Sequence, residues 1–142
     1  MNSVLIAIAA LLLFWGGLAF WIRTISPDAA RLERPDTMPE PGTHTTMGGS
    51  TTVLMPKDLD AAFNRLHQVV QNSDRTTRMA SDPDHRSFVT RTKVMGFPDV
   101  VHVWREGGRL AISGHLTIGK GDAGVNAKRN VRWLEEAGLT PS

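Results

Sequence analysis

The chain of 142 residues contains no cysteine. This absence excludes disulfides, thiolate metal sites and a cysteine nucleophile. Tyrosine is also absent, and two of the four tryptophans lie in an N-terminal apolar run, so no aromatic platform for stacking nucleic-acid bases is evident. The formal net charge of +2 is too small to indicate binding to nucleic acid. We therefore expect no nucleic-acid partner.

Motifs for metal binding and catalysis are lacking as well. The sequence has no His-Glu-x-x-His motif, no pair of histidines four residues apart and no Gly-x-Ser-x-Gly elbow. Gly119, Gly121 and Gly124 spell Gly-x-Gly-x-x-Gly. A dinucleotide site also requires a following strand with an acidic residue that holds the ribose, and the chain does not supply them. We expect no metal, no cofactor and no enzymatic activity.

The long apolar run covers residues 4–22 and carries no charge. As a helix it would span about 28 Å, close to the thickness of the hydrocarbon layer. A cleaved signal peptide would need a basic start and a small-x-small cleavage site, and neither is present. The run therefore predicts an uncleaved, single-pass anchor in a bacterial inner membrane. Arg23, Arg31 and Arg34 follow it, which favours a cytoplasmic domain, and a periplasmic domain stays open.

Residues 23–50 are rich in proline, glycine and threonine and show no apolar periodicity. Proline fixes φ and removes a hydrogen-bond donor, so helix and sheet are both disfavoured. The segment is typical of an extended linker between an anchor and a folded domain. The alternative is that it lies ordered along the surface of a partner.

Residues 51–142 predict an α+β domain: an antiparallel sheet with two helices packed on one face. Asp58 is placed to cap a helix whose apolar residues share one side. Gly107-Gly108 predicts a two-residue hairpin that pairs Glu106 with Arg109. A last helix is expected over Val125–Glu136, with Ala127, Val131 and Leu134 along its buried side.

The hairpin register divides its side chains between two faces of the sheet. The apolar face, which we expect to be the core, holds Val101, Val103, Leu110, Ile112 and Leu116. The opposite face is expected to be open to a partner, and it collects Arg91, Lys93, His102, Trp104 and His115.

A second candidate contact surrounds the start of the last helix, where Lys120, Lys128, Arg129 and Arg132 lie. Cations there oppose the helix macrodipole, so a compensating negative charge is expected. Asp122 supplies one as a cap, and a bound lipid phosphate or partner carboxylate is the alternative. The turn before the helix is interpreted as structural, through Gly119, Asp122, Gly124 and Asn126.

Two segments resemble a known family. They are Lys93-Val94-Met95-Gly96-Phe97-Pro98-Asp99-Val100 and Gly119-Lys120-Gly121-Asp122-Ala123-Gly124-Val125-Asn126-Ala127-Lys128-Arg129-Asn130-Val131. In sequence and spacing they resemble the bacterial and chloroplast family called domain of unknown function 1499, and the membrane-anchored α-proteobacterial members in particular. Gly121 and Ala123 stand where serine and leucine are usual. The resemblance implies no activity, and its plastid members suggest energy-transducing membranes.

Two hypotheses for function follow. The first is a non-enzymatic accessory or assembly subunit that docks on a larger integral membrane complex, respiratory or photosynthetic, through the sheet face. The second is a membrane-tethered module that binds an anionic small molecule or lipid head group of the bilayer through Lys120, Lys128, Arg129 and Arg132.

Overall fold

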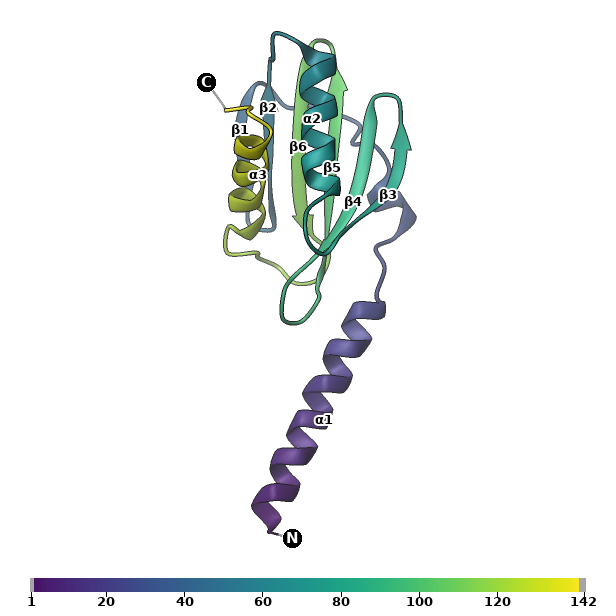
Figure 1. Ribbon diagram of the computed structural model, residues 1–142, viewed down its shortest axis with the longest axis vertical. Coiled ribbons are helices and arrows are strands. Elements are labelled where there is room, and N and C mark those ends of the chain that lie inside the picture. Colours follow the sequence, from purple (N-terminus) through teal and green to yellow (C-terminus); the bar gives the residue numbers. More distant parts are fainter. Residues whose placement is uncertain (1, 141–142) are drawn as a thin grey trace.

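A computed structural model describes residues 2–140 as a six-stranded antiparallel sheet, two helices packed on it and a long N-terminal helix that projects away (Figure 1). The elements in chain order are α1 (Ser3–Thr24), the 3-10 helix η1 (Ala29–Leu32), β1 (Gly42–Thr46), β2 (Gly49–Leu54), α2 (Leu59–Gln71), β3 (Thr76–Asp82), β4 (His85–Arg91), β5 (Pro98–Glu106), β6 (Arg109–Leu116) and α3 (Val125–Glu136). The strand order is β1-β2-β6-β5-β4-β3. The predicted α+β class is confirmed.

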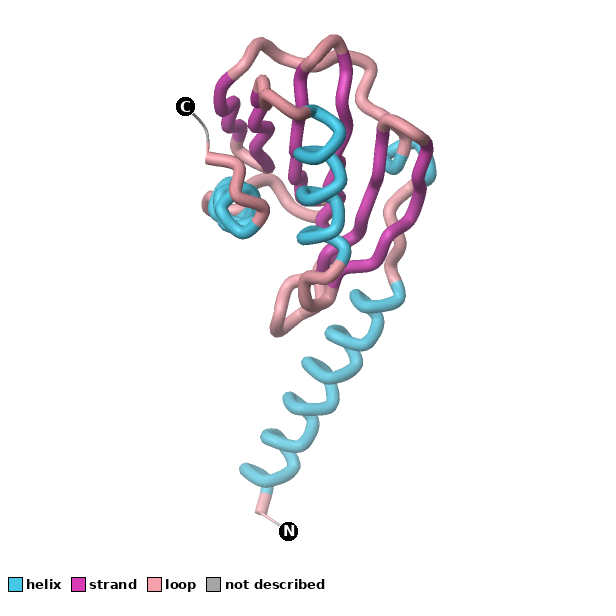
Figure 2. The backbone as a smooth tube through the Cα atoms, turned by 45° about the horizontal axis from the view of Figure 1, so that its top comes forward, coloured by secondary structure: helices cyan, strands magenta, loops and turns pink. Residues whose placement is uncertain are grey.

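The main apolar core lies between one face of the sheet and helices α2 and α3. Figures 1 and 2 show both helices in front of the same face. Asp58 caps α2, since its Oδ1 accepts a hydrogen bond from the N–H of Ala61 at 3.0 Å. The buried side chains of this core come from both helices and from the middle strands: Ala62, Phe63, Leu66, Val70, Phe88, Val101, Val103, Leu110, Ile112, Trp133, Leu134, Ala137 and Leu139.

The β5–β6 hairpin has the predicted register. Glu106 pairs with Arg109, His102 with Ser113 and Trp104 with Ala111. Gly107 and Gly108 have φ values of +57° and +79°, which a two-residue turn of type I′ requires and which other residues rarely adopt. The turn therefore fixes which side chains face α2 and α3.

The second face of the sheet is covered by residues 29–41, which we call the strap. Met38 packs against Trp104, Val53 and Ala111, and Trp104 is only 1 % exposed. The strap is held at its far end because Arg109 Nη1 donates to the carbonyl oxygen of Pro39 at 3.1 Å. The prediction that Trp104 and His102 lie on an open face is therefore wrong. Strand alternation separates two faces, but it does not show which of them the rest of the chain covers.

The predicted linker over residues 23–50 is also too long. Strands β1 and β2 begin at Gly42 and Gly49, inside that range. Strand β1 is exposed along its whole length and consists of glycine, threonine and histidine, so it has no apolar alternation by which it could be recognised. Its threonines are β-branched, which suits an edge strand.

Helix α3 has the predicted bounds, and Leu134 is buried as predicted, but the rest of its buried side differs from the prediction. Val131 is 43 % exposed, whereas Asn126, Asn130, Trp133 and Leu134 are buried. The buried asparagines are hydrogen-bonded, as Asn130 Nδ2 shows by donating to the carbonyl oxygen of Ser50 at 3.0 Å. An assignment by apolar spacing misses a helix face that is half polar.

Helix α1 meets the domain only at its C-terminal end. Ile22 is its one buried residue among those described. Arg91 Nη2 donates to the carbonyl oxygen of Ile25 at 2.8 Å, and Arg23 Nη2 donates to that of Val94 at 2.7 Å. The helix is long and apolar enough to cross a membrane.

Candidate anion-binding site

A basic groove lies between the C-terminal half of α2, the loop that follows it, the end of β4 and the helix α3. Its volume is about 830 Å³. Six of the side chains that line it are basic: Arg65, Arg75, Arg91, Lys93, Arg129 and Arg132. Two are acidic, Asp74 and Glu136, so the lining carries a formal excess of four positive charges (six minus two). This is a strong local imbalance in a chain whose net charge is only +2.

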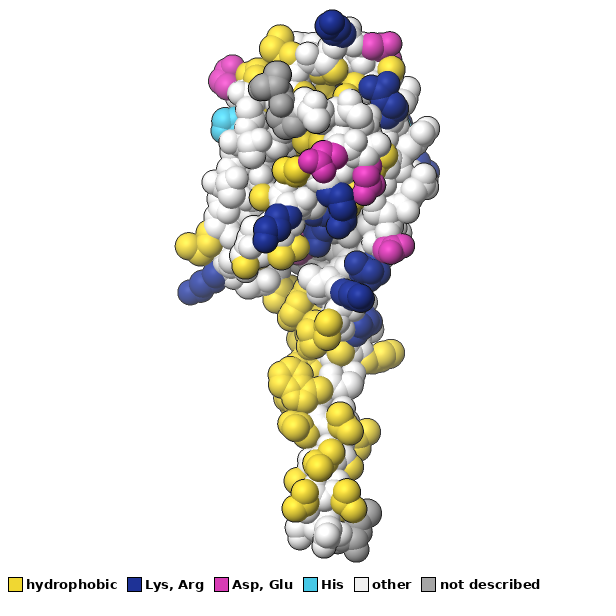
Figure 3. Space-filling model, turned by 60° about the vertical axis from the view of Figure 1, so that its left-hand side comes forward, with side chains coloured by type: hydrophobic (Ala, Val, Ile, Leu, Met, Phe, Trp, Pro, Cys, Tyr) yellow, Lys and Arg dark blue, Asp and Glu magenta, His cyan; other side chains and the backbone are white. Residues whose placement is uncertain are grey.

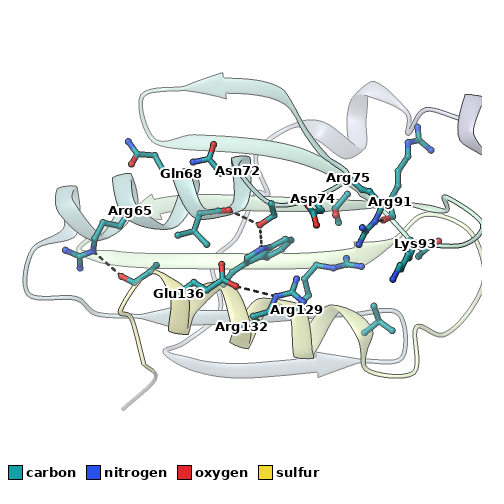
Figure 4. A pocket seen from close by; sticks show the side chains of 17 residues that line it. Arg65, Gln68, Asn72, Asp74, Arg75, Arg91, Lys93, Arg129, Arg132 and Glu136 are labelled. Atoms are coloured by element: carbon teal, nitrogen blue, oxygen red, sulfur yellow. Dashed lines mark hydrogen bonds and ion pairs between the residues drawn. The ribbon is translucent and has the colours of Figure 1, made fainter.

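The basic side chains span the length of the groove. Figure 4 shows Arg91 and Lys93 at one end and Arg65 at the other, with Arg129 and Arg132 between them. Arg65 is fixed because its Nε donates to the carbonyl oxygen of Ala137 at 3.1 Å. Figure 3 shows basic side chains gathered over one side of the domain and near its junction with the apolar helix. The groove therefore extends from the body of the domain towards α1.

Trp133 is buried beside the groove and ties its two helices together. The indole Nε1 of Trp133 donates to Ser73 Oγ at 2.5 Å, and Ser73 Oγ donates to the carbonyl oxygen of Val69 at 2.8 Å. The guanidinium of Arg129 lies 5.9 Å from the centre of the indole ring, within the range of a cation–π interaction. The buried indole ring therefore holds the guanidinium of Arg129 in place beside the groove.

Arg129 is also held by a buried polar cluster of Asp99, Asn126 and Arg129. Its Nη1 donates to Asp99 Oδ2 at 3.1 Å and to Asn126 Oδ1 at 3.2 Å. Asn126 Nδ2 lies 3.4 Å from Asp99 Oδ2 and donates to it. Burial raises the pKa of Asp99 above its ordinary value, and the hydrogen bond from Arg129 opposes that rise. The cluster joins the start of β5 to the start of α3.

Asn126 also explains a glycine in the middle of β6. A Cβ atom at Gly114 would lie 2.5 Å from Asn126 Oδ1, a distance that no real side chain tolerates. Asn126 is 0 % exposed. Only glycine at position 114 lets α3 approach the sheet closely enough to form the cluster.

The strand-to-helix corner before α3 is built as predicted. Asp122 accepts hydrogen bonds from the N–H groups of Gly124 and Asn126, both at 2.9 Å. Burial alone would raise the pKa of Asp122, but these backbone hydrogen bonds outweigh it and lower the pKa. Gly119 and Gly124 have φ values of +100° and +76°, so both turn positions favour glycine.

The four cations expected around the start of α3 separate into two pairs. Arg129 and Arg132 line the groove, whereas Lys120 and Lys128 are exposed and lie outside it. Asp122 supplies the negative charge at the helix start. Arg91 and Lys93, expected on the sheet face, lie in the groove instead. The sequence gives no signal for Arg65 and Arg75, because they come from separate segments that only the fold brings together.

The remaining residues of the expected sheet face lie beneath or beside the strap. His102 Nδ1 and His85 Nε2 are 2.9 Å apart and form a hydrogen bond. Burial, followed by repulsion from His85, lowers the pKa of His102 to about 4. His115 is half-buried and contacts Ser113, with 2.5 Å between Nε2 and Oγ. His85, the partner of His102, is the first residue of β4 and was not among the residues expected at this face.

No group of three or more histidine, aspartate and glutamate side chains within residues 2–140 is arranged to hold a metal ion. The His85–His102 hydrogen bond directs two ring nitrogens at each other. Neither of these nitrogens is free for another ligand.

Fold and site together define a small antiparallel α+β domain, attached to one apolar N-terminal helix and carrying a basic groove. The chain belongs to the family described as "Protein of unknown function (DUF1499)", whose family model matches residues 30–136. The match includes nearly all of the strap and excludes α1, so the strap is part of the family domain. No curated protein matches the chain significantly.

Proposed function

We propose that the protein is a single-pass protein of the bacterial inner membrane whose domain binds an anionic small molecule or lipid head group in the basic groove. The observation that carries the proposal is that six basic side chains and only two carboxylates line one groove. Arginine guanidinium groups bind phosphate and carboxylate oxygens through two parallel hydrogen bonds. The groove offers several of them within one concave surface.

The position of the groove favours a ligand at the membrane surface. Arg91 lines the groove and also donates to the carbonyl oxygen of Ile25, directly after α1. Arg23, Arg31 and Arg34 follow the apolar segment of α1, and this bias favours a cytoplasmic domain. The cytoplasmic leaflet is rich in anionic lipid, so phosphate groups are abundant where the groove lies.

The test compares two charge-matched variants of the full chain in nanodiscs of zwitterionic lipid. In the groove variant, Lys93→Gln and Arg132→Gln remove two exposed cations of the lining. In the control variant, Lys120→Gln and Lys128→Gln remove two exposed cations outside it. Calorimetric titration with soluble short-chain phosphatidylglycerol and with inorganic phosphate should show binding that salt weakens.

We expect the groove variant to bind about tenfold more weakly, because two exposed charge contacts at about 0.7 kcal/mol each together contribute about 1.4 kcal/mol. The control variant should bind like the unaltered protein. Equal losses in the two variants, or no saturable binding of either probe, would refute the proposal. A response to phosphatidylglycerol alone would identify the lipid head group as the ligand.

We propose as a second candidate that the chain is an accessory subunit of a larger membrane complex, now through α1 instead of the sheet face. The supporting observation is at Gly16 and Gly17, where an added Cβ would have no neighbour within 4 Å. Such an open notch allows a partner helix to approach closely. Mild solubilisation followed by native gels tests this candidate, and migration at the size of the monomer alone would exclude it.

A further inference from the structure

The loop between β4 and β5, residues 92–97, is a compact structure beside the end of α1. We call it the membrane-proximal loop. The N–H of Thr92 donates to the carbonyl oxygen of Phe97 at 3.0 Å, and the N–H of Gly96 donates to that of Thr92 at 3.1 Å. Thr92 Oγ1 accepts a further hydrogen bond from the N–H of Phe97 at 2.9 Å. These bonds close the loop and leave Lys93 and Val94 exposed at its tip.

The loop is held against the last turn of α1. Arg23 Nη2 donates to the carbonyl oxygen of Val94 at 2.7 Å. A Cβ atom at Gly96 would lie 2.6 Å from Arg23 Cγ, so glycine permits this close contact. Helix α1 has 22 residues and is about 33 Å long, slightly more than the hydrocarbon thickness of about 30 Å. Arg23 therefore lies at the boundary of the hydrocarbon layer, and the loop lies at the same depth.

The side chains of the loop suit that depth. Val94 is 78 % exposed, and it stands between Lys93 on its own loop and Arg23 on α1. An apolar tip flanked by cations matches the interfacial layer, where acyl chains meet anionic phosphates. A single exposed valine elsewhere on a domain would need no explanation, but this one lies beside the end of a membrane-spanning helix.

We propose that the membrane-proximal loop enters the interfacial layer of the leaflet in which α1 ends, with Val94 at the acyl-chain boundary and Lys93 and Arg23 on lipid phosphates. The domain then has two contacts with the bilayer, and they fix its orientation. The Lys93 end of the basic groove faces the head groups as a result. The proposal rests on α1 as the proposed membrane anchor, but it does not require a ligand in the groove.

The absence of cysteine makes the test direct, because one introduced cysteine takes one spin label. Three full-chain variants are compared in nanodiscs: Val94→Cys at the loop tip, Leu12→Cys in the middle of α1, and Glu106→Cys in the β5–β6 turn. All three positions are exposed, so the label should leave the fold intact, and circular dichroism checks this. Loop and turn lie at opposite ends of β5, about 27 Å apart.

Collisions of the spin label with water-soluble nickel chelate and with oxygen report its depth. We expect the label at position 94 to meet the chelate severalfold less often than that at 106, and oxygen more often. If position 94 behaves like 106 while 12 is shielded, the loop proposal is overturned and the anchor stands. If position 12 is as accessible to the chelate as 106, the anchor is refuted as well.

A second arm tests the charges. In nanodiscs that contain phosphatidylglycerol, the label at position 94 should be less accessible to the chelate than in nanodiscs of phosphatidylcholine alone. Lys93→Gln should reduce that difference, and Arg23 should account for what remains. Equal accessibility in the two lipids would remove Lys93 and Arg23 as phosphate contacts.

Discussion

Acidification should destabilise the domain through His102, which is buried beneath the strap. His102 is 6 % exposed and hydrogen-bonded to His85. Burial and the repulsion from His85 lower the pKa of His102 to about 4 from the model-peptide value of 6.5. The unfolded chain therefore binds more protons than the folded one between pH 6.5 and pH 4. The free energy of unfolding falls as the pH falls through this window.

The size of the effect follows from the two pKa values. A full shift from 6.5 to about 4 corresponds to about 3 kcal/mol, because each pH unit is worth about 1.4 kcal/mol. The unfolded chain takes up most of this proton above pH 5. The free energy of unfolding therefore falls by about 2 kcal/mol between pH 7 and pH 5. His85 and His115, whose pKa values burial also lowers, add to the loss in the same direction.

The assay is chemical denaturation of the full chain in detergent micelles at pH 7 and pH 5, followed by tryptophan fluorescence. The variant His102→Asn keeps a hydrogen-bonding side chain but carries no charge at any pH in this range. Its loss of stability between pH 7 and pH 5 should be about 2 kcal/mol smaller than that of the unaltered protein. His44→Asn, on the exposed strand β1, is the matched control and should retain the full loss.

Comparing changes with pH, instead of absolute stabilities, cancels the cost of removing the imidazole at neutral pH. It also cancels the pH-dependent contribution of carboxyl groups such as Asp99, because the variant and the unaltered protein share them. If His102→Asn shows the same loss as the unaltered protein, the buried neutral histidine is not the source of the acid sensitivity. That result would refute the reasoning from its burial and its contact with His85.

Three further predictions concern the contacts that hold α3, and denaturation in micelles measures each. Gly114→Ala should lower the free energy of unfolding by about 1–3 kcal/mol, because its Cβ would lie 2.5 Å from Asn126 Oδ1. In an Asn126→Ala background the same substitution should cost much less, and additive losses would contradict the clash. Asn126→Ala alone should cost about 1–3 kcal/mol, since it leaves Asp99 and Arg129 with one partner fewer. Trp133→Phe should lower the free energy of unfolding by about 1 kcal/mol, because the hydrogen bond to Ser73 is lost. Ser73→Ala should cost less in the Trp133→Phe background than in the unaltered protein, because that hydrogen bond is already absent.

Local signals in the sequence predict much of the fold. The Gly107-Gly108 turn fixes the hairpin register, Asp58 and Asp122 mark the helix starts, and the bounds of α3 are confirmed. These features depend on residues close together in the chain. The buried side of α3 is different, because it uses Asn126 and Asn130 in hydrogen bonds to other elements, and apolar spacing cannot reveal them.

The candidate site was harder to predict for a related reason. The groove combines Arg65 from α2 with Arg91 from β4 and Arg129 from α3, and no spacing in the sequence connects them. Trp104 is of a residue type that is common at protein interfaces. It is buried because the strap covers it, and the strap has no periodic pattern by which the sequence could reveal it. Long-range packing decides both features.

If α1 spans a membrane as we propose, the strap also limits how far the domain can move from the bilayer. If residues 25–50 were a free tether, they could extend about 85 Å, enough to act on soluble targets well inside the compartment. With residues 29–41 bound to the sheet, only residues 25–28 join α1 to the domain, a length of about 13 Å at full extension. With α1 in a membrane as we propose, any ligand or partner of the domain must therefore come within reach of the bilayer surface.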